Sequence, residues 1–161
     1  MQIKANEKML LLRYSNYKKF NFIEEHQKTL AAEGTVWMLK IGKKIPETKL
    51  KDIYEHGGVL ILRSPKASGS KYYAAQIKKC FNGEPDFEML YPEYYETMLD
   101  DDDMWTMDSL EGTWFQVTAV KELSEDAAFH FFLISNGKPV EEVLSSTRSS
   151  MIYIKSDKDF K

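Results

Sequence analysis

The feature that most constrains this 161-residue chain is the alternation of side chains between Gly112 and Val120. Successive side chains of an extended strand point to opposite faces of a sheet, so Trp114, Gln116 and Thr118 would share one face. The bulky apolar residues between them would occupy the other face. We therefore expect the fold to be organised around a β-sheet.

Five further segments have the composition of strands, being rich in apolar, β-branched and aromatic residues and bounded by turn residues. They are Lys8–Tyr14, Thr35–Ile41, Val59–Leu62, Tyr72–Lys78 and Ser149–Lys155.

Helix signals lie between these strands. Asn21 followed by Glu24 predicts a helix N-terminus, and Gly34 predicts its end. A short helix should follow Pro46, another should run from Ser124 to about Ile134, and a further turn should follow Pro139. Six strands and about four short helices predict an α+β fold, with a curled, mainly antiparallel β-barrel covered by the helices.

Composition narrows the class of protein. The length favours one domain over residues 1–161, and no apolar run approaches the ~20 residues that span a bilayer. The first residues lack the apolar core of a signal peptide, and the only cysteine, Cys80, excludes an intramolecular disulfide. We expect a cytoplasmic protein with no membrane partner.

Charge is unevenly spread along the chain. Residues 1–80 contain 16 Lys and Arg against 7 Asp and Glu, whereas residues 81–161 contain 6 against 18. Such a difference indicates either a basic binding face with an acidic flank or two halves that the fold interleaves. The overall net charge of −3 argues against sequence-independent coating of DNA, which needs many phosphate contacts.

Four segments, in this order, resemble EVE domains, a branch of the PUA-like superfamily. They are Val36–Lys40, Gly57–Ser64, Gly112–Leu123 and Thr147–Ile154. The resemblance covers about residues 35–160 and implies a PUA-like barrel. Residues 1–34 would then be an added strand and helix, and the acidic stretch 82–111 an insert. Ser150 and Tyr153 stand where the family has valine and proline.

The resemblance implies a non-catalytic module that holds a base, often a modified one, flipped out of DNA or RNA. Aromatic faces would stack on the base while hydroxyl groups read its edge. The implied base pocket consists of Trp37, Ser64, Trp114 and Ser149. Cations at its rim would hold phosphates, and these are Lys40, Arg63, Lys66, Lys71 and Arg148.

Each of these residues also has a structural interpretation. Trp37 and Trp114 could fill the core, the loop Arg63–Lys71 could be a solvated hairpin, and Arg148 could pair with a buried carboxylate. Two other functions also remain open. One is a regulator that binds a small molecule or nucleotide, and the other is a protein-interaction module that uses the acidic segment 82–111.

The residues give little support to catalysis. Cys80 with His26, His56 or His130 is the only thiol–imidazole set. Lys78 and Lys79 would lower the thiol pKa if they were close, but no nucleophile signature surrounds Cys80, and His130 lies in an apolar run that predicts a core position. No His or Cys pair has metal-ligand spacing. We expect no enzyme activity, no metal and no cofactor.

Overall fold

The computed structural model describes residues 1–66, 69–101 and 110–161, with main-chain detail only for residues 99–101. Its strands are β1 (Met9–Arg13), β2 (Val36–Ile41), β3 (Gly58–Arg63), β4 (Tyr72–Gly83), β5 (Gly112–Glu122), β6 (Phe131–Leu133) and β7 (Met151–Ser156). The helices are α1 (Phe22–Glu33), α2 (Glu47–Tyr54), α3 (Tyr94–Asp101) and α4 (Val140–Leu144), with the 3-10 helix η3 (Glu125–Phe129). Trp105, within the expected insert, lies outside the described residues.

The α+β class is confirmed, but the sheet differs from the expected barrel. Within the described residues the seven strands form one mixed sheet in the order β2-β5-β4-β3-β1-β7-β6. It is open, with β2 and β6 at its two ends, and the pair β1–β3 is parallel.

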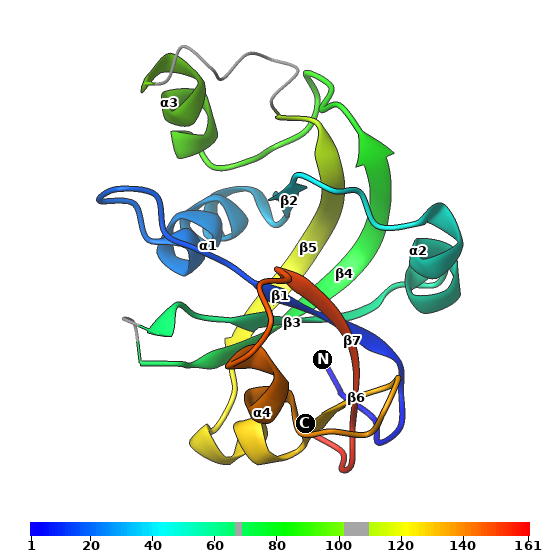
Figure 1. Ribbon diagram of the computed structural model, residues 1–161. Coiled ribbons are helices and arrows are strands. Elements are labelled where there is room, and N and C mark those ends of the chain that lie inside the picture. The colour runs from blue at the N-terminus through cyan, green and yellow to red at the C-terminus, as the bar shows by residue number, and fades with distance from the viewer. Residues whose placement is uncertain (67–68, 102–109) are drawn as a thin grey trace. The chain divides into compact units, whose positions relative to one another are not determined.

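The chain divides into two compact units, each built from separate stretches of sequence (Figure 1). The terminal unit comprises residues 1–15, 58–76 and 120–161, and so holds both ends of the chain. The central unit comprises residues 16–57 and 77–119. The terminal unit carries 12 Lys and Arg against 8 Asp and Glu, and the central unit carries 10 against 17. Interleaving of the two halves therefore reduces the charge asymmetry of the sequence but does not remove it.

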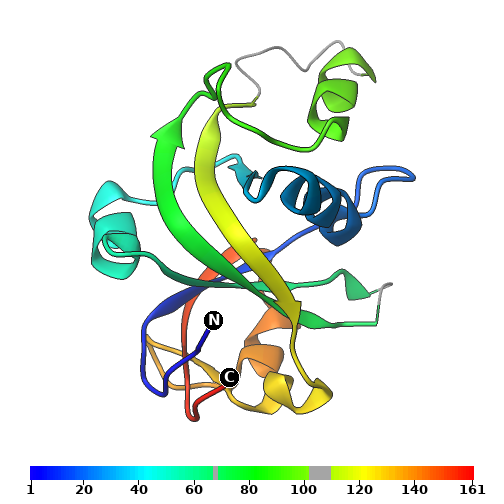
Figure 2. The same cartoon turned by 180° about the vertical axis from the view of Figure 1, so that it is seen from behind.

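The terminal unit is organised around β1, whose residues Met9–Leu12 are buried on both faces. β1 pairs in parallel with β3, from Leu10 opposite Leu60 to Arg13 opposite Arg63, and antiparallel with β7. The parallel strands β1 and β3 are neighbours in the sheet (Figure 2). A strand buried on both faces has a continuous apolar sequence, which explains why the run at 9–12 predicted it.

One face of this part of the sheet packs against η3 and α4. The core there is formed by side chains of β1, β3, β4 and β7 together with Ala127, Phe131, Val140 and Leu144, all of them buried. The single helix predicted from Ser124 to about Ile134 is wrong. η3 ends at Phe129, and Phe131–Leu133 pair with β7 as strand β6. Sheet pairing by aromatic residues therefore overrode the helical pattern.

The central unit begins with α1, which forms where the sequence predicted it. The Asn21 side chain accepts a hydrogen bond from the Glu24 N–H at 3.0 Å, and Gly34 ends the helix in the left-handed conformation with φ 78°. β2 pairs antiparallel with β5, and Trp37 lies opposite Gln116. Gly112 starts β5 where the backbone of β2 leaves no room, because a Cβ there would lie 2.2 Å from the carbonyl oxygen of Lys40.

A chain of hydrogen bonds around His26 joins three segments of the central unit. The Leu39 N–H donates to the Tyr95 hydroxyl oxygen at 3.1 Å, and that hydroxyl lies 2.6 Å from His26 Nε2. His26 Nδ1 lies 2.7 Å from the carbonyl oxygen of Phe22. A carbonyl only accepts, so Nδ1 carries the proton and Nε2 accepts from the tyrosine. Neutral His26 is thereby fully satisfied although it has no exposed surface.

This burial makes the fold sensitive to acid. Burial lowers the pKa of His26 from 6.5 to about 4, so between these values the unfolded chain binds more protons than the folded one. As pH falls through that window, the free energy of unfolding should therefore decrease by about 3 kcal/mol because of His26. We expect His26→Leu to be less stable at pH 7 but to lose this part of the pH dependence in denaturant titrations.

The exposed His56 provides the control. His56→Ala should keep the acid sensitivity of the wild-type chain. Equal slopes of stability against pH for wild type and His26→Leu would contradict the assignment to His26.

Candidate functional site

Two loops singled out in the sequence meet at one end of the terminal unit's sheet. β1 and β3 are parallel and in register, so Arg13 and Arg63 end them side by side. The Tyr14 N–H donates to the carbonyl oxygen of Arg63 at 3.3 Å, so the loop that begins at Ser64 leaves the sheet next to Tyr14. The Arg13 N–H donates to the carbonyl oxygen of Ser150 at 2.8 Å, which brings the loop 145–150 to the same place.

The Arg13 side chain fastens the second loop. Its guanidinium donates to the carbonyl oxygen of Thr147 at 2.8 Å and to that of Ser149 at 3.4 Å. Between these residues Arg148 is exposed, and the described part of the chain contains no hydrogen bond or ion pair of its guanidinium. Lys66 and Lys71 are exposed on the other loop. The Lys71 Nζ lies 3.3 Å from Glu122 Oε1. We call this end, formed by Arg13, Ser64, Lys66, Lys71 and Arg148, the cationic edge.

The two predicted serines do different things. Ser64 is buried, and its hydroxyl accepts the Lys71 N–H at 2.6 Å, which closes the loop on itself. It also bonds the Tyr14 side chain, whose pKa burial raises to about 12. Ser149 is exposed, and its hydroxyl donates to the carbonyl oxygen of Met151 at 2.7 Å. Ser64 therefore shapes the cationic edge from inside, whereas Ser149 lies at its surface.

Arg63, predicted as a rim cation, makes an internal ion pair. Its guanidinium donates two hydrogen bonds to the carboxylate of Glu141 in α4, from Nε to Oε1 at 3.0 Å and from Nη2 to Oε2 at 3.1 Å. It also donates to the Ser64 carbonyl oxygen and the Ser70 hydroxyl, and the Tyr72 hydroxyl donates to Glu141. Partial burial acts to raise the pKa of Glu141, but the bonds from Arg63 and Tyr72 hold it below its usual value.

We expect Arg63→Lys to destabilise the chain by about 1–3 kcal/mol, because an ammonium cannot reproduce a bidentate fork and leaves acceptors of this partly buried site unsatisfied. The same exchange at the exposed Arg148 should change stability by less than ~0.5 kcal/mol. Denaturant unfolding of both variants measures the difference. Equal effects would mean that Arg63 is no more structural than Arg148.

The remaining predicted site residues belong to the central unit. Trp114 is fully buried, and its Nε1–H donates to the carbonyl oxygen of Leu110 at 3.1 Å. Trp37 is 9% exposed and meets Phe81 edge to face. Lys40 is buried as well, its Nζ donates to the carbonyl oxygen of Lys43 at 2.6 Å, and burial lowers its pKa. A single pocket formed with Ser64 and Ser149 stays a prediction.

The two tryptophans share their surroundings with a group of tyrosines. The rings of Tyr91, Tyr95 and Trp114 all contact one another, with centroid separations of 5.5 to 6.0 Å. Tyr94 packs edge to face on Tyr95 and stacks on Phe20. Tyr94 and Tyr95 are buried, and Tyr91 is partly exposed. Tyr94, Tyr95 and Trp114 could therefore not stack on a base without a rearrangement.

The surroundings of Cys80 and His26 act against the roles of nucleophile and base. Burial, together with Glu47, raises the pKa of Cys80 to about 11, instead of the lowering that Lys78 and Lys79 would cause if they were close. Both ring nitrogens of His26 are engaged in the bond chain through Tyr95. At pH 7 the thiol is protonated and is therefore a weak nucleophile.

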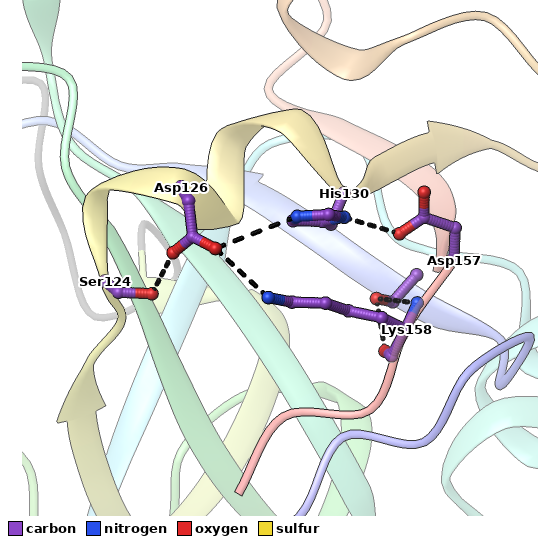
Figure 3. Close-up of polar contacts among 6 residues, drawn as sticks. Ser124, Asp126, His130, Asp157 and Lys158 are labelled. Atoms are coloured by element: carbon purple, nitrogen blue, oxygen red, sulfur yellow. Dashed lines mark hydrogen bonds and ion pairs between the residues drawn. The ribbon is translucent and has the colours of Figure 1, made fainter.

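His130 was expected in the core, but it lies in a charged cluster at the surface of the terminal unit (Figure 3). Its Nδ1 is 2.7 Å from Asp157 Oδ1, and its Nε2 is 3.7 Å from Asp126 Oδ2. Lys158 Nζ lies 3.0 Å from the same Asp126 oxygen, and Ser124 donates its hydroxyl to the other one. The bonds from Ser124 and Lys158 lower the pKa of Asp126.

This cluster contains the residue types of a catalytic triad without its geometry. A triad serine donates to histidine, which is held by the carboxylate on its other side. Here both nitrogens of His130 face carboxylates, and Ser124 bonds Asp126 instead. The cluster ties η3 to the turn after β7. The sequence spacing of Asp126 and His130, four residues apart, was the only signal that could have found it.

Comparison with protein-family models, with curated proteins and with solved structures gave no match. In residues 1–66, 69–101 and 110–161, no group of three or more His, Cys, Asp and Glu side chains is placed to hold a metal ion. None of the described helices has the length and apolar character needed to cross a membrane.

Proposed function

We propose that this chain is a non-catalytic nucleic-acid-binding module that contacts phosphates at the cationic edge. The observation that carries the proposal is the convergence of the loops 64–71 and 145–150 at the ends of β1 and β3. Loops held by a rigid sheet commonly bind ligands. Lys66, Lys71 and Arg148 are exposed there, with backbone and hydroxyl groups between them.

The charge of the terminal unit supports this choice of ligand. Its Lys and Arg outnumber its Asp and Glu by four, although the whole chain is acidic. The two internal arginines, Arg13 and Arg63, are committed to holding the loops and α4. Phosphate contact would therefore fall to the three exposed cations, which position a strand without reading its sequence.

The finer parts of the proposal come from the resemblance to EVE domains. They are a PUA-like curling of the sheet and a modified or extruded base as the preferred ligand. We place the module in the cytoplasm, where its single free thiol, Cys80, would remain reduced.

Binding of labelled single- and double-stranded DNA and RNA across a salt series tests the proposal. Three phosphate contacts predict a slope of log affinity against log salt of about −2 for a single strand, and Arg148→Ala should reduce its magnitude by about 0.7. Lys4→Ala removes the same charge from the exposed N-terminal segment and should leave the slope unchanged.

Two results would contradict this assignment. One is the absence of binding below ~100 µM at low salt, where phosphate contacts are strongest. The other is an equal loss in both variants, which would indicate net charge rather than the cationic edge. Oligonucleotides that carry modified bases test the finer proposal separately, because a preference for one base would appear at constant salt slope.

A further inference from the structure

The loop that follows β4 forms an acidic and partly apolar surface on the central unit. It is pinned to β2, because the Trp37 N–H donates to the carbonyl oxygen of Leu90 at 2.8 Å. Inside the loop the Glu88 N–H donates to Asp86 Oδ1 at 2.9 Å, and Met89 is buried beneath. The loop is therefore held in place from its own turn and from the sheet edge.

This turn presents a large apolar side chain to solvent. Phe87 at its tip is 97% exposed, and Leu90 is 40% exposed. A side chain this exposed contributes almost nothing to folding by burial. Aromatic residues, Phe among them, are enriched in the cores of protein interfaces relative to the rest of the surface. Phe87 is therefore available for contact with a partner at no cost to the fold.

Two adjoining hollows lie beside this turn. The first, of about 420 Å³, is lined by Phe87, Leu90 and Tyr91 together with the carboxylates Asp86, Glu93 and Glu96. The second, of about 370 Å³, shares Leu90, Tyr91 and Glu93 and reaches Glu25 and Glu33 of α1. Since they share these three residues, the two hollows are neighbours, and together we call them the acidic groove.

Its charge is strongly one-sided. Five carboxylates line the acidic groove, and the one cation among the lining residues, Lys28, lies 3.3 Å from Glu25. The central unit as a whole has seven more Asp and Glu than Lys and Arg. Nucleic acid and anionic lipid would be repelled from such a surface, whereas a cationic ligand would be attracted.

We propose that the acidic groove binds a partner polypeptide segment in which Lys or Arg residues flank an apolar residue. The apolar side chain would cover Phe87 and Leu90. The flanking cations would enter the two hollows and meet Glu93 from both sides, with Asp86 and Glu96 on one side and Glu33 on the other. This surface is separate from the cationic edge in sequence and in charge, so the two proposals stand independently.

A selection from a random peptide display library on the full chain tests this inference. Enriched peptides should carry at least two Lys or Arg around an apolar residue. Binding of a labelled enriched peptide, followed by fluorescence anisotropy, should weaken about tenfold in Phe87→Ser with its salt dependence kept. In Glu93→Lys it should weaken about tenfold and lose part of its salt dependence.

Matched substitutions outside the groove provide the controls. Phe129→Ser removes an apolar side chain that is 77% exposed on the terminal unit, and Glu55→Lys reverses an exposed charge on the central unit. Both should bind the peptide as the wild-type chain does.

Three results of these binding experiments would overturn the inference. The first is a selection that enriches no peptide, or only peptides without cations. The second is an equal loss of peptide affinity in the groove and control variants. The third is displacement of the peptide by spermine that binds the wild-type chain and Phe87→Ser with the same affinity. Self-association that depends on Phe87 would also overturn it, because the occupant would then be a second copy.

Discussion

The parallel pairing of β1 with β3 is the constraint on which the rest of this structure depends. Two parallel neighbours cannot be joined by a tight turn, so the chain between them must make a long crossover. Here that crossover carries residues 14–57, including α1, β2 and α2. The central unit is built largely from this excursion and from the far parts of β4 and β5, while the terminal unit takes what precedes and follows.

The same pairing gives the molecule its two chemically different surfaces. Parallel strands end at the same edge, so the loops after β1 and β3 meet there, and β7 brings a third segment to them. The Arg63–Glu141 pair and the bonds from Arg13 hold these loops in place. Most of the acidic residues fall in the central unit, and five of them line the acidic groove beside the exposed Phe87.

Hydrogen bonds of buried polar groups hold separate segments together within each unit. In the central unit, Leu39, Tyr95, His26 and Phe22 form a chain in which every donor has an acceptor. This arrangement fixes the tautomer of His26 and keeps it neutral. In the terminal unit, the guanidinium of Arg63 donates several hydrogen bonds at once. Loss of the Glu141 carboxylate would leave this buried positive charge without its counter-ion, which is strongly destabilising.

The sequence by itself determined the elements whose signals are local. The Asn21 cap, the Gly34 stop, the Pro46 and Pro139 helix starts and the apolar run at Met9–Leu12 all depend on neighbouring residues, and all are present. Only the tertiary structure decided which partners the charged residues have. Arg63 pairs with Glu141, His130 with Asp157, and Trp114 lies buried rather than open to a base. These contacts join residues far apart along the chain, and strand pairing, which no local pattern specifies, brings them together.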